Sequence, residues 1–285
     1  YVPGGKAVYP SSVVMNVLAA QGAGVASIAL ASPPQEAFGG SVHPTILAAA
    51  SLLGIEEVYA MGGAGAIGAL AYGVPGVGLE PVQVITGPGN LFVATAKRAV
   101  TGVVGIDSEA GPTEILIIAD ETARVDLVVA DLLSQAEHDE LASAVLVTTS
   151  SSLADAVAAA LPAAADATPH AARVTTALQG QQSAIVIVDD LAVACRFSDA
   201  YAPEHLELHV ADPHALLPAL SHAGAIFVGA HTPVSLGDYA AGSNHVLPTG
   251  GQARFSAGLG AYTFLRAQQV VEYDRAALGA IADDV

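Results

Sequence analysis

The sequence predicts an α/β protein made of two Rossmann-like, doubly wound units with parallel sheets, followed by a short C-terminal segment. Short apolar runs alternate with segments of helical composition along most of the chain. These runs lack polar–apolar alternation, which is typical of parallel strands covered by helices on both faces. The pattern restarts after residues 110–112, so two halves of similar size follow one another.

The first half is expected to form a domain of residues 1–112. Strands are expected at 25–31, 57–61 and 82–86, and helices at 44–53, 65–72 and 91–100. A glycine-rich segment follows each of the last two strands, at 62–66 and 87–90. Each of these segments therefore joins a strand to a helix, as in a βαβ unit.

The second half is expected to form a domain of residues 113–258, with 259–285 left as the C-terminal segment. Strands are expected at 114–118, 144–148, 184–188, 206–209 and 225–228, and helices at 127–137, 153–160, 193–200 and 215–221. The Ala-rich stretch 162–169 is interpreted as a surface connection. Residues 229–260 are interpreted as one long loop. Its length and its His, Asp, Asn and Tyr content favour a functional role.

Composition excludes several classes of protein. The 285 residues are 53% hydrophobic and 13% charged, enough apolar material for a large core. The net charge of −18, from 27 acids and 9 bases, argues against a basic nucleic-acid surface. No apolar run reaches the roughly 18 residues of a membrane span. The single cysteine, Cys195, suits a reducing cytoplasm and is expected to be a small buried hydrophobe.

Three polar segments carry the candidate chemistry, and two of them suggest a metal site. Gln135 and His138 are three residues apart at the end of a helix, so they project from one face and could bind a metal. Asp238, between Gly237 and Tyr239, could supply a carboxylate ligand. The alternatives are an exposed polar helix end and a turn-forming aspartate.

The third segment, Glu204–His205, offers a carboxylate beside an imidazole at the edge of a strand. Such a pair suits acid–base work near neutral pH, and its members could serve two different steps. A surface loop pair is the alternative. Asn244 and His245, in the long loop, are further candidates for contacting a polar ligand.

The glycine-rich segments suggest a phosphate-bearing ligand only weakly. Gly87–Asn90, with sequence GPGN, would let a ligand approach the backbone at a helix N-terminus. It does not match GxGxxG, however. The glycines of 62–66 are equally explained by close packing of a helix on a strand.

Together these segments resemble histidinol dehydrogenases. The matching stretches are YVPGG at 1–5, ITGPGN at 85–90, AKR at 96–98, EAGPTE at 109–114, DLLSQAEHD at 131–139, APEHLEL at 202–208 and GDYAAGSNHVLPT at 237–249. They keep the order of the family and run along nearly the whole chain. The resemblance implies a zinc-dependent, NAD-dependent four-electron oxidation of L-histidinol to L-histidine through an aldehyde.

The resemblance also implies a role for each matching residue. Gln135, His138 and Asp238 would be the zinc ligands of this chain, and all three would contact the substrate. His205 would accept the alcohol proton and contact the substrate, and Glu204 would activate water to hydrate the aldehyde. Further substrate contacts would come from Thr113 and His245. The cofactor-contacting positions would be Tyr1, Asn90 and Gly65.

The chain departs from the family in two respects. Gly65 stands where the family usually has a cofactor-contacting Gln, so a side-chain hydrogen bond to NAD is missing. The family also has residues before YVPGG, and a C-terminal tail that reaches the partner subunit's site. We therefore expect the chain to begin inside a larger protein. Residues 259–285 would be the start of a dimerisation segment in a cytoplasmic homodimer.

Three alternatives remain open at this stage. One is a related dehydrogenase of another small alcohol, such as a sulfonated diol, which would need Arg or Lys in its pocket. Another is a non-catalytic relative, suggested by Gly65 and the ends. The third is a zinc hydrolase with Glu204 as its base.

Overall fold

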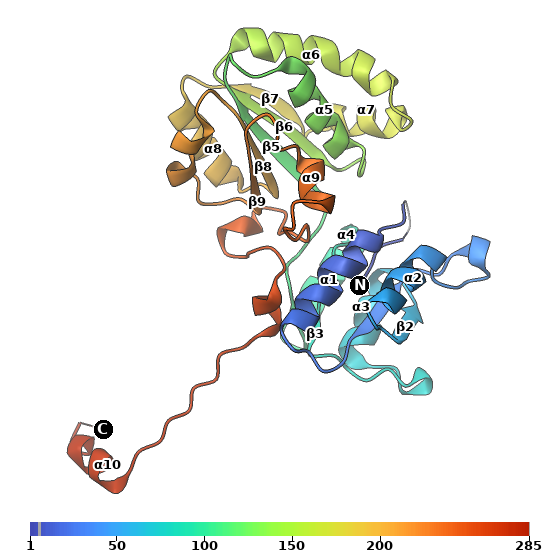
Figure 1. The fold of residues 1–285 in the computed structure, drawn as a ribbon, viewed down its shortest axis with the longest axis vertical. Coiled ribbons are helices and arrows are strands. Elements are labelled where there is room, and N and C mark those ends of the chain that lie inside the picture. Colours follow the sequence, from blue (N-terminus) through green and yellow to red (C-terminus); the bar gives the residue numbers. More distant parts are fainter. Residues whose placement is uncertain (5–6, 285) are drawn as a thin grey trace.

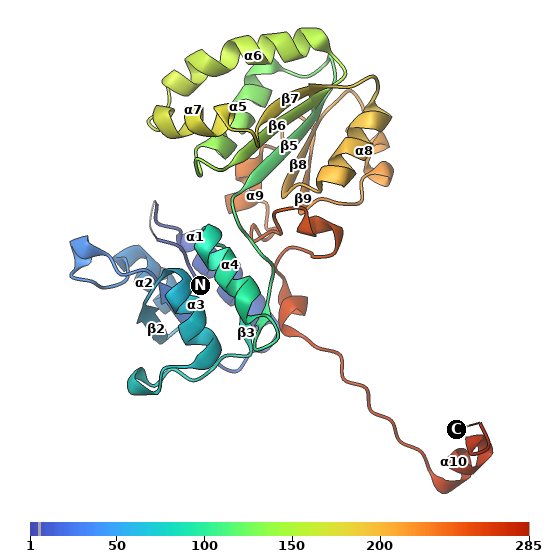
Figure 2. The ribbon, with the colours of Figure 1, turned by 180° about the vertical axis from the view of Figure 1, so that it is seen from behind.

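The computed structural model describes residues 1–4 and 7–284 and shows two α/β units followed by an extended C-terminal arm (Figures 1 and 2). All strand pairing within its sheets is parallel. The predicted α/β class with parallel sheets is therefore confirmed. No helix among the described residues is long and apolar enough to cross a membrane.

The first unit alternates helices and short strands. Its elements in chain order are α1 (Pro10–Gly22), β1 (Ala29–Ser32), α2 (Pro44–Leu52), β2 (Glu57–Ala60), α3 (Gly63–Tyr72), β3 (Val84–Ile85), α4 (Leu91–Val100) and β4 (Gly105–Ile106). α4 has the predicted bounds. α1 was not predicted, because its apolar residues are interrupted by Ser, Asn and Gln and give no clear period.

The sheet of the first unit is divided into two pairs, β1–β2 and β3–β4. Tyr1 and Val2 bridge the pairs, since the Tyr1 nitrogen donates to Thr86 O at 2.7 Å and Val2 N–H donates to Ala31 O at 2.9 Å. A cavity of about 500 Å³ lies beside this bridge, lined by residues of both β1 and β3. Tyr1 and Val2 thus hold the central position that β5 holds in the second unit.

The second unit carries one continuous five-stranded sheet in the order β7-β6-β5-β8-β9. Its elements are β5 (Glu114–Ala119), α5 (Val125–Ala136), β6 (Ser143–Thr148), α6 (Ser151–Asp166), α7 (Ala171–Gln179), β7 (Ala184–Ile187), α8 (Leu191–Tyr201), β8 (His205–His209), β9 (Ala225–Val228) and α9 (Val234–Tyr239). The order reverses direction at β5, as in a doubly wound fold.

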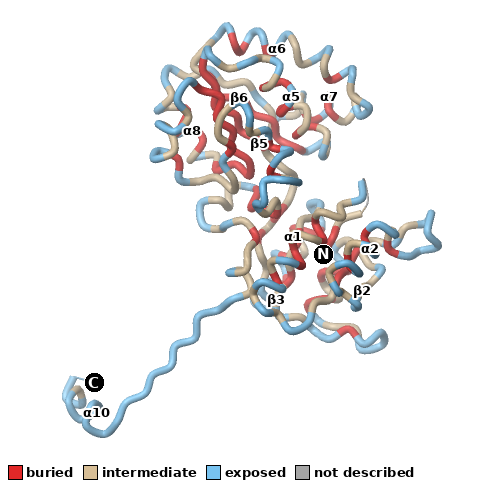
Figure 3. The backbone as a smooth tube through the Cα atoms, in the orientation of Figure 1, coloured by how far each residue is buried: buried red, intermediate tan, exposed pale blue. Residues whose placement is uncertain are grey.

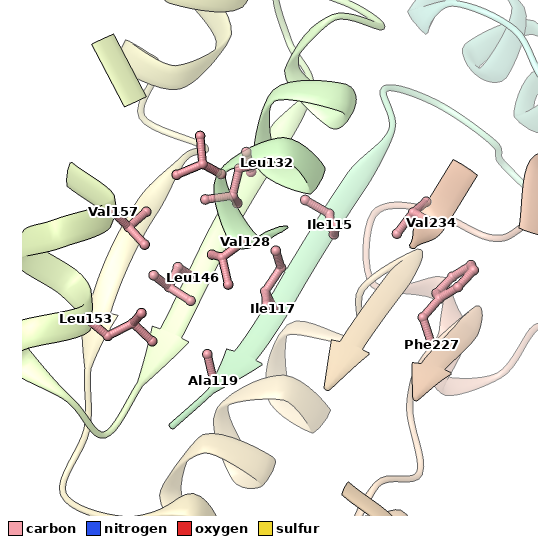
Figure 4. Close-up of a cluster of buried hydrophobic side chains, with 12 residues drawn as sticks. Ile115, Ile117, Ala119, Val128, Leu132, Leu146, Leu153, Val157, Phe227 and Val234 are labelled. Atoms are coloured by element: carbon pink, nitrogen blue, oxygen red, sulfur yellow. The ribbon is translucent and has the colours of Figure 1, made fainter. Parts of the chain in front are cut away.

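Helices cover both faces of this sheet, which explains the unbroken apolar runs of β5 and β6. On one face, Ile115 and Ile117 pack with Leu146 and with Val128 and Leu132 of α5 (Figure 4). The other face packs Leu116, Ile118 and the β8 leucines against α8. Cys195 lies in this second cluster at 3% exposure, so its predicted buried position in a helix is confirmed.

Three sequence-based assignments in the second unit were wrong. Pro162 lies inside α6 rather than in a surface connection. Pro in a helix interior costs about 3 kcal/mol, but the flanking alanines have the highest helix propensity. The predicted helix 215–221 is replaced by two 3₁₀ turns, Pro213–Ala215 and Leu217–Ala219, because Pro218 would interrupt a continuous helix.

The long polar stretch 229–260 is not one loop, since it contains α9 and the 3₁₀ turn Gln252–Arg254. After the 3₁₀ turn Ala261–Phe264, the chain extends away as an arm that ends in α10 (Arg275–Ile281). The arm is exposed along its length (Figure 3). Val270 and Val271 are 84% and 77% exposed, which is unusual for apolar side chains.

Candidate active site

Pairing of β5 with β8 creates the polar centre of the second unit. The register sets Ile115 opposite His205, so Thr113 and Glu114 lie beside Glu204 and His205. These residues stand at the amino ends of two parallel strands. Ligands of open α/β sheets usually bind at the carboxyl ends. The placement is therefore unusual, and strand order alone would not have indicated it.

Glu204 is buried and held by the start of β5. Its Oε2 accepts hydrogen bonds from the Thr113 hydroxyl at 2.6 Å and from Glu114 N–H at 3.0 Å. Burial raises the pKa of Glu204 to about 8, while these two hydrogen bonds oppose the rise and Asp238 adds to it. A carboxyl with this pKa can both take up and release a proton near neutral pH.

The pKa of His205 is shifted in the opposite direction from that of Glu204. Its Nδ1 lies 2.9 Å from the Glu114 carbonyl oxygen. A carbonyl can only accept, so Nδ1 carries the proton and Nε2 keeps a free lone pair. Burial lowers the pKa of His205, with Asp238 opposing. The Nδ1 of His205 is 3.7 Å from Glu204 Oε2, too far for a hydrogen bond, which favours separate roles for the two residues.

Thr113 joins Glu204 to the proposed metal ligands. Gln135 Nε2 donates to the Thr113 hydroxyl at 2.6 Å, and that hydroxyl donates to Glu204. The arrangement leaves the Gln135 amide oxygen free to act as a ligand. Gln135 is buried at the last turn of α5, and His138 follows the helix with part of its surface open to solvent and part shielded by neighbouring groups.

Asp238 lies on the short helix α9, not in the loop that the sequence suggested. Its charge acts on the pKa values of His138, His205 and Glu204, so it lies near all three. Desolvation lowers the pKa of His138, and Asp238 opposes this. The His245 Nδ1–H donates to the Asp238 carbonyl oxygen at 3.0 Å, which brings His245 to the same place.

The donor set therefore fits zinc. An amide oxygen, a neutral imidazole and a carboxylate are ligands that zinc accepts, and His138 needs no deprotonation because its pKa is lowered. Two of the proposed residues, Gln135 and Glu204, hydrogen-bond to the Thr113 hydroxyl. Asp238 acts on Glu204, His205 and His138, and His245 acts on His138, so side chains from α5, β8 and the 229–260 stretch lie near one another.

Asn244 serves a different purpose from the one suggested by the sequence. Its Nδ2 donates to Met15 O of α1 at 2.9 Å, and its Oδ1 accepts from Val246 N–H. Both halves of the amide are therefore used in fixing the loop against the first unit, and the side chain is not free to contact a ligand.

The three proposed cofactor positions lie around the glycine-rich loops of the first unit. The Tyr1 hydroxyl accepts from Gly63 N–H at 3.2 Å at the start of α3. Asn90 caps α4, since its Oδ1 accepts from Phe92 and Val93 N–H at 3.1 Å. Gly65 is exposed, and a Cβ built there meets no atom within 4 Å. Both loops follow the carboxyl ends of parallel strands, where nucleotides usually bind.

A buried ion pair holds the second glycine-rich loop. Lys97, 1% exposed, pairs with Asp107 and donates to Gly87 O at 2.9 Å. Asp107 Oδ2 accepts from Gly87 N–H at 2.8 Å. Gly87 has φ +113° and a Cβ there would lie 2.0 Å from Tyr1 O, so only glycine fits.

Sequence reasoning missed this ion pair and also Glu114. Burial raises the pKa of Glu114 to about 7, and Gly250 N–H donates to its Oε1 at 3.0 Å. In the sequence, Glu114 could have been noticed because it is the first residue of an apolar strand, three residues after Gly111. Lys97 gave a weaker signal, because a lysine inside a helix is normally solvated.

Comparison with known proteins first identifies the general architecture. An acetylating aldehyde dehydrogenase from Geobacillus thermoglucosidasius superposes with a TM-score of 0.59 at 14% identity, covering 96% of this chain and 75% of that chain. At this identity the likeness concerns the fold alone. The chain is thus a two-unit α/β protein of the kind also seen in aldehyde dehydrogenases.

Closer relatives identify the family. The family model described as histidinol dehydrogenase matches residues 1–285, and the chain belongs to this family. It is 71% identical over 282 residues to histidinol dehydrogenase of Leifsonia xyli subsp. xyli, covering 99% of this chain and 65% of the relative. The Nocardia farcinica enzyme is 61% identical, with coverages of 100% and 65%. The predicted family is thereby confirmed.

A solved structure agrees with this assignment. The crystal structure of histidinol dehydrogenase from Elizabethkingia anophelis matches with a TM-score of 0.91 at 36% identity, covering 100% of this chain and 64% of that chain. The chain thus spans about 65% of the length of the curated relatives that it matches.

Substitution of Gly237 by Ala is expected to displace Asp238. A Cβ at Gly237 would lie 2.7 Å from the Phe227 ring, which packs against His205 with 5.9 Å between ring centroids. We expect Gly237→Ala to lower the free energy of unfolding by about 1–3 kcal/mol. Urea unfolding would measure this. Ser235→Ala, on the exposed side of the same helix, should stay within about 0.5 kcal/mol of wild type. Equal values for the two variants would contradict the packing argument.

Proposed function

We propose that the protein catalyses the NAD-dependent, four-electron oxidation of L-histidinol to L-histidine. The observation that carries the proposal is the pair Glu204–His205, with opposite pKa shifts, joined through Thr113 to Gln135. Two successive oxidations of an alcohol need one group to remove the alcohol proton and another to activate water. The two residues suit these two tasks.

Zinc and NAD would supply the remaining chemistry. Gln135, His138 and Asp238 would hold zinc, which would fix the amino-imidazole substrate in place. NAD, contacted at Tyr1, Asn90 and the segment around Gly65, would accept the hydride of each oxidation.

His205 would handle the proton of the alcohol. Its Nδ1–H is committed to the Glu114 carbonyl, so the base is Nε2. Because burial lowers the pKa of His205, the imidazole is neutral at pH 7 and ready to accept a proton. Asp238, which raises the pKa of the same ring, would stabilise the imidazolium once it forms.

Glu204 would activate the water that hydrates the aldehyde. With its pKa near 8, the carboxylate is basic enough to take a proton from water that is adding to a carbonyl. The Thr113 hydroxyl and Glu114 N–H fix one carboxyl oxygen, Oε2. Oε1 is then the atom left to face water.

The charge around the site favours a cationic substrate over the sulfonated diol of a related dehydrogenase. Residues 202–249 contain no Lys or Arg, and the chain as a whole has 27 acids against 9 bases. A sulfonate would need a basic partner that this segment does not provide, whereas an amine would be attracted by the acidic field.

The arm supports a homodimer. Leu265, Val270, Val271, Tyr273 and Leu278 are exposed on residues 265–281. We propose that this segment packs on a partner subunit and that the partner completes the active site. The buried, unpaired Cys195 is consistent with a cytoplasmic location.

The direct test follows NADH formation by the full-length, zinc-loaded protein with L-histidinol. We expect two NADH for each histidinol consumed. His205→Asn should lower the rate of alcohol oxidation by about 10²- to 10⁴-fold, and Glu204→Gln should slow oxidation of the supplied aldehyde most. His222→Asn is the matched control, because the His222 ring hydrogen-bonds to the Asp199 carbonyl near the end of α8 and to none of the proposed site residues. A zinc-loaded protein that forms no NADH would support the non-catalytic alternative, and NADH only with another alcohol would support a sister dehydrogenase.

Removal of the Thr113 hydroxyl should move the pH profile of aldehyde oxidation. Its hydrogen bond favours the charged form of Glu204, so Thr113→Val should raise the pKa of Glu204 further above its ordinary value. The base form would then appear only at higher pH, and the rising limb of the profile should shift upward by about one to two pH units. Thr113→Ser, which keeps the hydroxyl, should leave the limb in place. A Val variant with an unchanged limb would remove this hydrogen bond from the mechanism.

Gly65→Gln should bind NAD as tightly as wild type or more tightly. The space around Gly65 is open, so the longer side chain fits without displacing α3 and adds a hydrogen-bonding group. Titration of NAD by calorimetry would measure the change, with Gly68→Gln on the same helix as control. Weaker binding by the Gly65 variant alone would show that NAD lies elsewhere.

A further inference from the structure

β8 carries a second polar group beyond the proposed active site. His205, Glu207 and His209 alternate with Leu206 and Leu208, so the three polar side chains share one face of the sheet. That face is covered by α5, whose Asp131 lies one turn before Gln135. His209 is four residues beyond His205, a separation of about 13 Å along an extended strand.

Asp131, Glu207 and His209 converge at this second position. One ligand atom from each lies within 4.8 Å of the other two. Glu207 Oε1 is 3.2 Å from His209 Nε2. The residues are 8%, 0% and 4% exposed, so the cluster is inside the core and is not a solvated acidic face.

The cluster is not satisfied by the surrounding chain. Among the described residues, no group outside the cluster meets hydrogen-bond geometry with either carboxylate oxygen of Glu207 or either ring nitrogen of His209. The Glu207 carboxyl interacts with Asp131 and His209, and both of them act on its pKa. Asp131 receives a hydrogen bond from the backbone of Val234. Buried polar atoms without partners cost about 1–3 kcal/mol each, and more when charged. The two carboxyls and the imidazole face one another without a bound group that would satisfy their buried polar atoms.

We propose that Asp131, Glu207 and His209 form a second divalent-cation site, suited to zinc, that is separate from the site of Gln135, His138 and Asp238. Zinc bound to nitrogen and oxygen at about 2.0–2.1 Å in a tetrahedron separates its ligands by about 3.3–3.4 Å. The 3.2 Å between Glu207 Oε1 and His209 Nε2 is close to this edge. Three protein ligands leave one position of a four-coordinate ion for water.

The position of this site gives it a structural role. It joins α5, which carries Gln135 and His138, to β8, which carries Glu204 and His205. A cation there would neutralise the two carboxyls and fix the helix against the strand below the active site. Burial raises the pKa of both Asp131 and Glu207, so protons are the competing occupants when no cation is bound.

Zinc stoichiometry tests the site without reference to catalysis. The full-length protein, dialysed against zinc at pH 7.5 and analysed by inductively coupled plasma mass spectrometry, should hold two zinc ions per chain. His209→Gln and Glu207→Gln should each hold one fewer than wild type. Loss of zinc from His138→Ala concerns the other site only. His214→Gln, an exposed histidine after the same strand, should match wild type.

A second measurement on the unaltered protein covers variants that fail to fold. Crystals grown with zinc should show an anomalous peak between Glu207 and His209 at the zinc absorption edge. No peak there, or unchanged stoichiometry in a folded His209→Gln variant, would overturn the proposal and assign the triad to a shared proton. If His209→Gln holds one zinc ion fewer than wild type but the wild-type protein forms no NADH, the second site is supported and the proposed oxidation is contradicted.

Discussion

The register of β5 against β8 is the constraint on which the rest of the site depends. Ile115 opposite His205 puts the Glu114 carbonyl beside the imidazole and the Thr113 hydroxyl beside the carboxyl of Glu204. A slip of one residue would turn His205 toward α8 and the β8 leucines toward α5. The apolar packing of the leucines on the α8 side opposes such a slip, since each buried Leu contributes about 1.5–3 kcal/mol. Core packing and site chemistry are therefore fixed by one pairing.

The same sheet tolerates an unusual amount of buried acid. Glu114, Glu204 and Glu207 all have a raised pKa because they are desolvated, and each would be more stable in water. Backbone donors offset part of the cost at Glu114 and Glu204. Glu207 has no such donor, which distinguishes a carboxyl held by the chain from one that awaits a cation or a proton. The two polar positions, Glu204–His205 and Glu207–His209, therefore differ in their hydrogen-bond partners more than in their burial.

Much of the second unit could be predicted from the sequence, because β5 and β6 are unbroken apolar runs. In the first unit, α4 was predictable because it has a strong amphipathic period. The first unit was harder, since β3 is only Val84–Ile85 and depends on tertiary packing for its existence. The proposed site residues stand in motifs that could be found in the sequence. The Gln135–Thr113–Glu204 chain of hydrogen bonds could not be found in this way, because it joins segments far apart in sequence. Asp131 and His209 gave no signal, since single polar residues on a helix or strand normally face water.

The stretch 229–260 connects the two units. The polar groups at the amino ends of β5 and β8 lie in the second unit, and the glycine-rich loops at the carboxyl ends of β2 and β3 lie in the first. Thr249 accepts from Gly111 N–H at 2.8 Å and donates to Glu109 O at 2.9 Å, and Gln252 accepts from Glu109 N–H. Asn244 adds the bond to α1. These contacts tie the stretch that carries Asp238 and His245 to the linker and to the first unit. The proposed acid–base pair lies at the start of the central strand β8. Asp238 and His245 instead lie on a segment that side-chain hydrogen bonds of Asn244, Thr249 and Gln252 hold against the linker and the first unit.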